Sequence, residues 1–416
     1  MVSSSLINPF SPTRYAEETT FAGRKNEIES IRACIRQTAN GMAQNFIITG
    51  EKGIGKSSLL MNIHRWAGSG EKSGKQYRIL PLLVTLDSED DVNSIVGKIK
   101  RQLMLSFKKH NPVFYWTKRA WDFVWMFKFL GVEKKDREST SSANWVALDR
   151  LSESLQNESM ARARWSLIGS FDGIALFFDE AERVKDDAKF GGMLRRLTEQ
   201  LQKDGAGNAM LGVVGQPSVF KQIRKDHGST LRNFSQIPLN PLSREDCLEL
   251  IAKGESSCEV LNSQRVDFDE SAKNWIVQNS GGYPHFVQMF CSKAFDHRKG
   301  DVITEADVWE SAYAPDHGAL AQIGESFFYD ITDPDQLSDN ARLVLRALAK
   351  GNERFTERAR LESFLGNDMS KEDIDEQLKA LRSMEKIEHN PNDSSLIRLK
   401  NRTLAHWLNL YYSNKN

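Results

Sequence analysis

Residues 45–58 read Asn-Phe-Ile-Ile-Thr-Gly-Glu-Lys-Gly-Ile-Gly-Lys-Ser-Ser, so a short apolar run leads directly into the pattern Gly-x-x-x-x-Gly-Lys-Ser. Glycines let the backbone curl until successive N–H groups point to one place, and such a cradle suits phosphate oxygens. The apolar run predicts a strand before the loop, and the residues after it predict a helix whose N-terminus favours negative charge. Residues 50–58 therefore predict a phosphate-binding loop (P-loop) for a nucleoside triphosphate, with a glycine-rich surface turn as the alternative.

Each position of this loop has an expected role. Lys56 is expected to reach the β- and γ-phosphate oxygens, and the Ser57 hydroxyl is expected to hold Mg²⁺. The backbone of the remaining loop residues is expected to line the phosphates: Gly50, Glu51, Lys52, Gly53, Ile54, Gly55 and Ser58.

A second motif follows the apolar run 174–178, which ends in Asp179-Glu180. We expect this run to be a strand adjacent to the strand of the P-loop, so that Asp179 reaches Mg²⁺ through its water shell. Glu180 would then lie where it can orient and deprotonate an attacking water, a role that nucleotide binding alone does not require. The alternative is that both carboxylates cap the next helix, and capping can coexist with catalysis.

Short apolar segments alternate with amphipathic helical stretches over residues 21–240. This alternation predicts an α/β fold, in which helices cover both faces of a parallel sheet. The expected strands are residues 45–49, 80–87, 174–179, 210–215 and 234–239.

The strand signal fades after residue 240. Residues 241–315 predict a helical lid domain, punctuated by the turn Gly-Gly-Tyr-Pro at 281–284. Residues 316–336 predict a linker helix. Residues 337–416 predict three helices followed by a β-hairpin, which is the winged-helix arrangement. Residues 1–20 are expected to form a separate N-terminal segment.

The composition gives no sign of a charged or membrane-embedded partner. The chain has 416 residues, and its 56 Lys and Arg balance its 56 Asp and Glu. The four cysteines have no Cys-x-x-Cys spacing, which favours reduced, mostly buried thiols over disulfides or zinc ligation. No stretch has the pattern of a signal peptide or of a membrane span, so we expect a cytoplasmic protein without integral membrane association.

Several motifs in order resemble the AAA+ superfamily. They are Phe21-Ala-Gly-Arg24-x-x-Glu27, the P-loop, the Asp179-Glu180 strand, Asn240-Pro-Leu-Ser243 and Gly281-Gly-Tyr-Pro284. The closest resemblance is to the branch shared by the origin-recognition and helicase-loader ATPases and the STAND signalling ATPases. It spans residues 8–300, and the winged-helix unit extends it almost to the C-terminus.

The resemblance implies ATP as the nucleotide and further residues that bind it. Asn8-Pro9-Phe10 and the stretch containing Gly23 and Arg24 would wrap the adenine, and Pro284 would close on the nucleotide from the lid. Many relatives have an arginine after the Gly-rich turn, where this chain has His285. A histidine can contact phosphate when protonated, and a structural histidine is the alternative.

Two more positions resemble residues that sense the nucleotide in relatives. Gln216, at the end of the fourth expected strand, lies near the place of a polar sensor of the γ-phosphate and the attacking water; a strand-end turn is the alternative. Arg232, before the fifth strand, resembles an arginine finger or sensor, and a solvated surface arginine is the alternative.

Residues 95–137 form a basic aromatic segment, with 11 Lys and Arg against 3 Asp and Glu and a local net charge of +8. Within it, residues 112–130 are apolar nearly all round a helix. Trp121, Trp125 and Phe129 recur at four-residue spacing, which is typical of packing in the protein's own core. A protein or oligomer interface, DNA and a membrane surface are the alternatives.

The winged-helix unit invites a DNA-binding hypothesis that its charges restrain. Its third helix begins Ser-Lys-Glu372-Asp373-Ile-Asp375-Glu376, and these carboxylates would repel phosphates. Residues 336–416 hold 14 Lys and Arg against 12 Asp and Glu, although Arg398, Lys400 and Arg402 could contact the DNA backbone. DNA binding and a structural or protein-binding role both stay open.

The sequence as a whole predicts an ATPase that acts as a molecular switch. Its nucleotide state would regulate assembly as a homo-oligomer, on DNA or on an effector protein encoded nearby, as in replication, mobile-element control or phage defence. The alternative is a nucleotide-stabilised, non-catalytic scaffold or protein-interaction module that binds ATP without turning it over.

Overall fold

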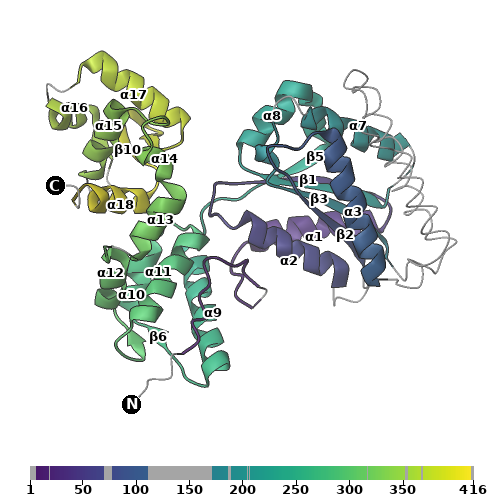
Figure 1. Cartoon of the computed structure of the whole chain (residues 1–416), viewed down its shortest axis with the longest axis horizontal. Helices are drawn as coiled ribbons and strands as arrows, with labels where there is room; N and C mark the ends of the chain where they lie inside the picture. The colour runs from purple at the N-terminus through teal and green to yellow at the C-terminus, as the bar shows by residue number, and fades with distance from the viewer. Residues whose placement is uncertain are drawn as a thin grey trace. The chain divides into compact units, whose positions relative to one another are not determined.

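The structure, a computed structural model of the whole chain, divides into two compact units (Figure 1). Arg24–Asn240 form the sheet unit, and Met1–Gly23 with Pro241–Asn416 form the helical unit. The structure describes residues 6–17, 19–69, 77–110, 171–185, 189–203, 205, 207–315, 317–351, 355–366 and 369–413. Of the basic aromatic segment, only residues 95–110 are among these, so its tryptophans and the residues Lys118, Arg119, Lys128 and Ser139–Ser142 lie outside the described part.

The sheet unit contains a parallel sheet of five strands, and the predicted α/β fold is confirmed. The strands lie in the order β2-β3-β4-β1-β5. Their bounds follow the predicted apolar runs closely: β1 Asn45–Thr49, β2 Ile79–Thr85, β3 Gly173–Asp179, β4 Ala209–Gly215 and β5 Phe234–Pro238.

One expectation about this sheet is wrong, because β3 is not adjacent to the P-loop strand β1. Strand β4 lies between them and pairs with both. Gly212 of β4 makes this close packing feasible, since a Cβ there would lie 2.6 Å from the ring of Phe177. The rings of Phe46 on β1 and Phe177 on β3 therefore approach across it, with centroids 6.0 Å apart.

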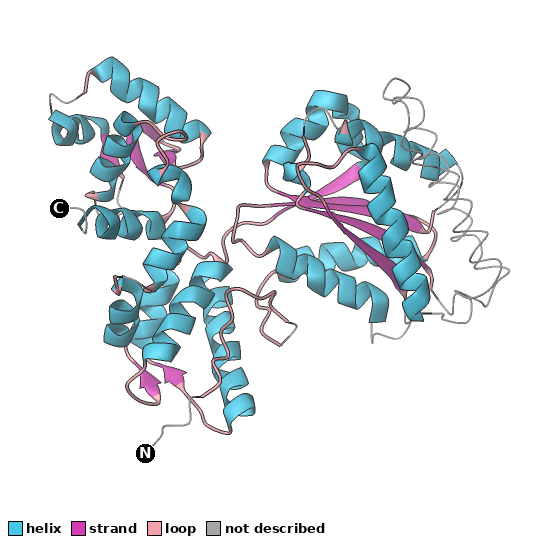
Figure 2. Cartoon of the chain, in the orientation of Figure 1, coloured by secondary structure: helices cyan, strands magenta, loops and turns pink. Residues whose placement is uncertain are grey.

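Helices cover both faces of the sheet (Figures 1 and 2). Helices α1 (Lys25–Ala39) and α2 (Lys56–Ser69) lie on one face. Helices α3 (Val92–His110), α7 (Phe190–Lys203) and α8 (Ser218–His227) lie on the other and share a large apolar core with the strands. No helix among the described residues combines the length and apolar character that a bilayer crossing requires.

The first part of the helical unit contains α9 (Arg244–Asn262), α10 (Glu270–Asn279), α11 (Pro284–His297) and α12 (Glu305–Tyr313). A short parallel pair, β6 (Asp267–Phe268) and β7 (Val302–Ile303), joins their ends. Side-chain caps explain where three of these helices begin, since Ser243, Asp269 and Thr304 each accept a hydrogen bond from the first turn.

The second part of this unit follows α13 (Ala319–Phe327) and α14 (Tyr329–Thr332). Helices α15 (Asp339–Ala349), α16 (Arg358–Leu365) and α17 (Lys371–Ser383) precede the hairpin of β9 (Ile387–Asn390) and β10 (Asp393–Leu399). Strand β8 (Thr356–Glu357) pairs with β10 as a third strand. The closing helix α18 (Arg402–Ser413) packs back onto α10, where the Thr403 hydroxyl donates to the Asn279 carbonyl at 2.6 Å.

Candidate functional site

The loop between β1 and α2 has a backbone that its glycines require. Gly53 and Gly55 have φ angles of 78° and 96°, a region that favours glycine. A Cβ at Gly50 would lie 2.7 Å from the Ile54 side chain, so the start of the loop also excludes larger residues. This cradle of backbone fits the phosphates of a nucleotide, as the sequence pattern predicts.

Arg24 holds the P-loop from the beginning of α1. Its side chain is buried, its Nη2 donates to the Ile54 carbonyl at 3.1 Å, and its Nη1 lies 3.4 Å from the Glu27 carboxylate. The residue thus supports the predicted phosphate-binding loop, and its contact with adenine stays a prediction.

Lys56 lies at the start of α2 and turns back over the loop. Its Nζ donates to the carbonyl oxygens of Gly50 at 2.9 Å and Glu51 at 3.0 Å. Burial lowers the pKa of Lys56, while the carboxylates of Glu182, Asp179 and Glu180 act in the opposite direction. The acidic end of β3 is therefore close enough to the P-loop lysine for their charges to interact, although β4 separates the two strands.

Asp179 is the residue that meets Ser57. Its side chain is 8% exposed and accepts a hydrogen bond from Ser57. Burial raises the pKa of the Asp179 carboxyl, and the nearby charges of Glu180 and Glu182 raise it further, while its hydrogen bonds lower it. A carboxylate and a hydroxyl beside a phosphate cradle are a donor set that suits Mg²⁺, a hard cation that prefers oxygen.

Glu180 occupies a turn immediately after β3. Its φ of 57° is in the left-handed region, and its N–H donates to Asp179 Oδ1 at 2.9 Å. The carboxylate, 36% exposed, pairs with Arg183 at 3.1 Å. The side chain makes no capping hydrogen bond to the short helical turn Ala181–Arg183 that follows, so helix capping does not account for Glu180.

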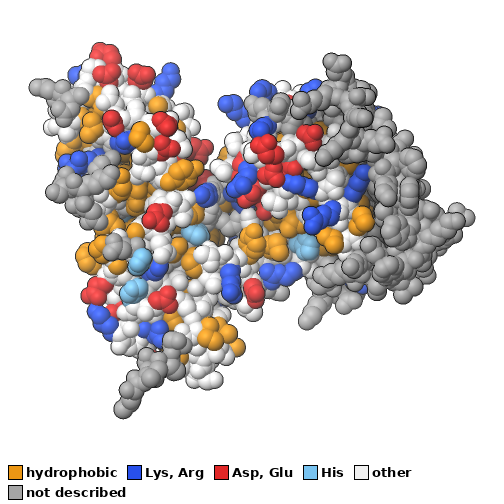
Figure 3. Space-filling view, in the orientation of Figure 1, with side chains coloured by type: hydrophobic (Ala, Val, Ile, Leu, Met, Phe, Trp, Pro, Cys, Tyr) orange, Lys and Arg blue, Asp and Glu red, His pale blue; other side chains and the backbone are white. Residues whose placement is uncertain are grey.

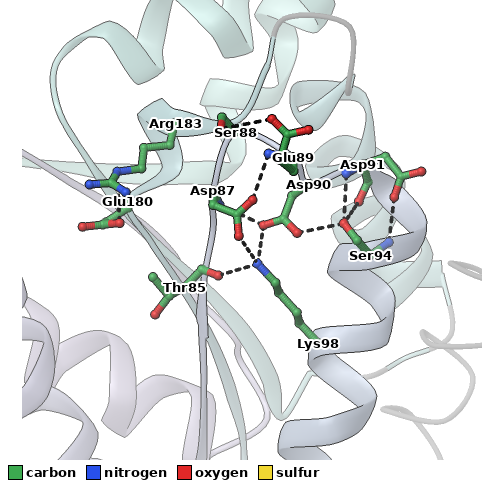
Figure 4. Close-up of polar contacts among 10 residues, drawn as sticks. All are labelled: Thr85, Asp87, Ser88, Glu89, Asp90, Asp91, Ser94, Lys98, Glu180 and Arg183. Atoms are coloured by element: carbon green, nitrogen blue, oxygen red, sulfur yellow. Dashed lines mark hydrogen bonds and ion pairs between the residues drawn. The ribbon is translucent and has the colours of Figure 1, made fainter.

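An acidic loop at the end of β2 lies beside this turn (Figure 4). The Lys98 amino group of α3 binds the Thr85 carbonyl at 3.0 Å and the carboxylates of Asp87 and Asp90 at 3.0 Å and 2.5 Å. The hydrogen bond from Lys98 lowers the pKa of Asp87, and Arg183 acts in the same direction. The loop is therefore an acidic edge of the site that Lys98 holds in place.

Gln216 and Arg232 lie at opposite ends of the α8 region. Gln216 follows β4, and its backbone N–H and side-chain Nε2 donate to the two carboxylate oxygens of Glu182 at 3.1 Å and 3.0 Å. Arg232 is exposed in the helical turn Gly228–Asn233 before β5. Glu182 is a site residue that sequence reasoning missed, because nothing in Asp-Glu-Ala-Glu distinguishes its last carboxylate from a solvated one.

Pro284, His285 and Gly23 belong to the helical unit and are described within that unit. Pro284 is the first residue of α11, and the ring of His285 packs against Phe327, with centroids 4.8 Å apart. Gly23 has a φ of 68° and lies against Asp246, where a Cβ would be 2.7 Å from the carboxyl carbon.

The N-terminal segment is anchored in the helical unit. The ring of Phe10 is 4% exposed and packs edge-on against Phe268, with centroids 5.7 Å apart. Asn8 Nδ2 donates to the Ser292 carbonyl at 3.0 Å and to Asp296 at 2.7 Å. Pro9, between Asn8 and Phe10, is half-buried. Packing thus holds the Phe10 ring in the helical unit, and its contact with adenine stays a prediction.

A phosphate cradle with a lysine and a serine, beside an Asp-Glu pair at the carboxyl edge of a parallel sheet, defines a P-loop nucleotide-binding protein. Residues 20–203 match the family model described as the AAA ATPase domain, and the predicted resemblance to the AAA+ ATPases is confirmed. Among curated proteins, no sequence matches the chain.

Solved structures resemble the whole chain at low sequence identity. The ORC2 protein of Aeropyrum pernix, solved in ADPNP–ADP complexes, is 14% identical with a TM-score of 0.58, and the match covers 98% of each chain. A Walker-type ATPase of Pyrococcus abyssi is 12% identical with a TM-score of 0.56, covering 96% of this chain and 99% of that one. Cdc6p of Pyrobaculum aerophilum is 14% identical with a TM-score of 0.50, covering 99% and 98%. At these identities the likeness shows the shared fold.

Proposed function

We propose that this protein binds and hydrolyses ATP and uses the bound nucleotide as a conformational switch. The observation that carries the proposal is the hydrogen bond between Ser57 of the P-loop and Asp179 at the end of β3, with Glu180 as the next residue. A serine and an aspartate joined in this way are suited to hold one Mg²⁺ between them. The AAA ATPase domain supports the same conclusion.

Each side chain then has a chemical task. Mg²⁺, held by Ser57 and Asp179, would neutralise charge on the phosphates of the substrate. Lys56 would leave the Gly50 and Glu51 carbonyls to bind the phosphates, since both partners are weak compared with a charged oxygen. Glu180 would accept a proton from the attacking water, and Gln216 would orient that water.

The switch would control assembly of the protein with itself or with a partner. The ADPNP–ADP complexes named for the Aeropyrum pernix protein support an adenine nucleotide as the ligand. Pro284 and His285 in the helical unit are proposed to respond to the nucleotide, and Arg232 to act as an arginine finger or sensor in an oligomer. We propose a cytoplasmic setting and an effector encoded nearby, as in replication, mobile-element control or phage defence.

One observation favours the non-catalytic scaffold as a second candidate. The carboxylate proposed as the general base is engaged by Arg183 at 3.1 Å, so it would have to leave this ion pair before it could reach an attacking water. In the scaffold, ATP would stabilise the fold without turnover. The two functions differ in a single measurable quantity, which is the rate of phosphate release.

Phosphate release is therefore measured with Mg²⁺-ATP for the wild type, Glu180→Gln and Glu199→Gln. Glu199 pairs with Arg195 on the surface of α7, so Glu199→Gln controls for the loss of one carboxylate. We expect Glu180→Gln to lower kcat by at least about 100-fold, because it removes the general base, and Glu199→Gln to match the wild type. Turnover by neither the wild type nor the control would favour the scaffold, and an unchanged rate in Glu180→Gln would exclude Glu180 as the base.

The described charges of the C-terminal hairpin give little support to DNA as a partner. Positive and negative side chains are interspersed on the face that Figure 3 shows. Arg398 pairs with Glu388 at 2.5 Å, and Lys400 pairs with Glu385 at 3.0 Å, within the hairpin that would be the wing. We keep the winged-helix assignment as a proposal and propose protein contact for this unit, with DNA contact as the alternative.

A further inference from the structure

We propose that Glu182 is a positioning residue that fixes the amide orientation of Gln216, so that the Gln216 carbonyl oxygen is the group offered to the attacking water. The inference rests on the proposed ATPase function and adds a residue to it. Glu182 has no place in the predicted set of site residues, and the structure gives it two contacts to one partner.

The two contacts form a clamp on Gln216. Glu182 Oε2 accepts from the Gln216 backbone N–H at 3.1 Å, and Glu182 Oε1 accepts from Gln216 Nε2 at 3.0 Å. One bond fixes the main chain where β4 ends, and the other fixes the end of the side chain. Both oxygens of one carboxylate are thus used to hold a single residue.

The chemistry of a carboxylate decides which way the amide faces. An ionised carboxylate only accepts hydrogen bonds, so the NH₂ group of Gln216 must be the end that faces Glu182. The oxygen Oε1 lies on the other side of the amide carbon and is directed away from the carboxylate. A glutamine without this partner could rotate its amide and present either group.

Glu182 is itself fixed by α8. The side chain of Gln222 donates from Nε2 to the Glu182 carbonyl at 3.0 Å and to the Val184 carbonyl at 2.9 Å. The short turn that carries Glu182 is therefore fastened to the helix that begins two residues after Gln216. This bracing limits the freedom of both ends of the clamp.

The clamp lies where a water-orienting group is needed. Gln216 follows β4, which is the strand between the P-loop strand β1 and the Asp179 strand β3. Parallel strands bring these three carboxyl ends to one edge of the sheet. Glu182 is also the carboxylate with the largest effect on the pKa of Lys56, which it raises, so the clamp is electrostatically coupled to the phosphate-binding lysine.

Gly215 provides a second way to test the clamp without removing its charge. A Cβ at Gly215 would lie 2.9 Å from Glu182 Oε2, closer than side-chain atoms normally approach. The carboxylate is the flexible end of its side chain, so Gly215→Ala should displace it from Gln216. Glu182→Gln instead keeps the shape and removes the charge, and it places an NH₂ group opposite a donor.

The experiment measures kcat and KM for ATP, together with the melting temperature, of the wild type, Glu182→Gln, Gly215→Ala, Gln216→Ala and the double variant Glu182→Gln/Gln216→Ala. We expect both clamp variants to lower kcat on the order of tenfold, because a misplaced water-orienting group slows the chemical step. In Gly215→Ala the KM should change by less than about threefold, since this variant keeps the Glu182 charge near Lys56. At saturating ATP the kcat of the double variant should be no lower than that of Gln216→Ala alone, because Glu182 acts on the chemical step through Gln216, whereas its effect on Lys56 concerns phosphate binding.

The outcomes separate this role from the proposed function. A wild type without turnover overturns the ATPase proposal and this role together. If the wild type turns over ATP and Gly215→Ala has the same kcat, only the clamp is overturned. Any effect of Glu182→Gln is then due to the lost charge of Glu182. A double variant slower than Gln216→Ala overturns the claim that Glu182 acts through Gln216. If Glu182→Gln fails to fold, the kcat of Gly215→Ala still decides between support and rejection.

Discussion

At the scale of single residues, Asp179 combines a chemical requirement with a thermodynamic penalty. The proposed role of Asp179 as a Mg²⁺ ligand requires the ionised carboxylate, yet burial raises the pKa of this carboxyl and so disfavours its ionised form. A group with a folded pKa above its unfolded value contributes most to stability at low pH, and this contribution is lost as pH rises through the raised pKa. At neutral pH the ionised Asp179 therefore lowers the stability of the fold.

We accordingly expect Asp179→Asn to stabilise the protein at pH 7 without nucleotide while it abolishes Mg²⁺-dependent turnover. The gain should be about 1 kcal/mol, the usual size of a stabilising substitution at a residue that serves function at a cost in stability. It should grow as pH rises from the ordinary carboxyl pKa of 3.8 through the raised value. Thermal unfolding at a series of pH values checks both the sign and the trend.

Asp87→Asn is the matched control, because its shift has the opposite sign. The hydrogen bond from Lys98 lowers the pKa of Asp87, so ionised Asp87 contributes stability above its unfolded pKa that is lost as pH falls. Asp87→Asn should therefore lower the melting temperature at pH 7. A lower melting temperature in Asp179→Asn as well would contradict the argument from burial.

Phe10 allows packing and nucleotide contact to be separated at one residue. Its ring is enclosed by Phe268, Phe295 and Gly254, where a Cβ would overlap the ring. We expect Phe10→Ala to destabilise the helical unit by about 3–5 kcal/mol, the usual effect of emptying a buried aromatic site. Scanning calorimetry measures this loss, and a weaker affinity for ATP with unchanged unfolding would instead support the adenine contact.

At the scale of secondary-structure elements, replacing either of two helical glycines with alanine should change stability, and the two changes should have opposite signs. Gly324 of α13 lies against the indole of Trp407 on α18, which a Cβ would overlap. Gly97 of α3 is exposed and has nothing within 4 Å of the added Cβ. One glycine permits a close approach of two helices, and the other only weakens its own helix.

Gly324→Ala should therefore destabilise the helical unit by roughly 1–3 kcal/mol, since Trp407 must move out of its packed position. Gly97→Ala should stabilise the sheet unit by up to about 1 kcal/mol, the difference in helix propensity. Scanning calorimetry on the two variants checks both signs. Stabilisation by Gly324→Ala would show that α13 and α18 do not pack as described.

The same scale shows what the sequence could predict. Continuous apolar runs locate β1, β3 and β4 because strands buried on both faces must be apolar throughout. The order of the strands could not be predicted in this way. Gly212 of β4 leaves room for the rings of Phe46 and Phe177, and this role becomes visible only when the three strands are placed side by side.

For the candidate site, too, the sequence predicts some residues and misses others. Lys56, Ser57 and Asp179 belong to motifs whose spacing predicts a shared role, and the structure brings their side chains close to one another. The roles of Glu182 and Arg24 depend on contacts between residues about 30 positions apart along the chain, with Gln216 and Ile54 respectively. Such pairs have no local signal in the sequence.

At the scale of the whole molecule, the remaining question is whether the C-terminal hairpin contacts DNA. Its basic residues already have partners, because Arg398 pairs with Glu388 and covers the Phe355 ring at 4.5 Å, while Lys400 pairs with Glu385. A phosphate contact would have to break each ion pair. The acidic start of α17 adds to this penalty, since Glu372, Asp375 and Glu376 are exposed there.

We therefore expect the double variant Arg398→Ala/Lys400→Ala to bind duplex DNA within about twofold of the wild-type affinity, with the same dependence on salt. The matched control is Lys379→Ala/Arg382→Ala, which removes the same charge from exposed positions of α17. Binding of the full chain is measured over a series of salt concentrations. A slope of log K against log salt that falls by about 1.8 in the hairpin variant alone would contradict the expectation, because each phosphate contact contributes about 0.9 to that slope. Such a result would mean that both ion pairs open to bind phosphate and that the hairpin is a DNA-contacting wing.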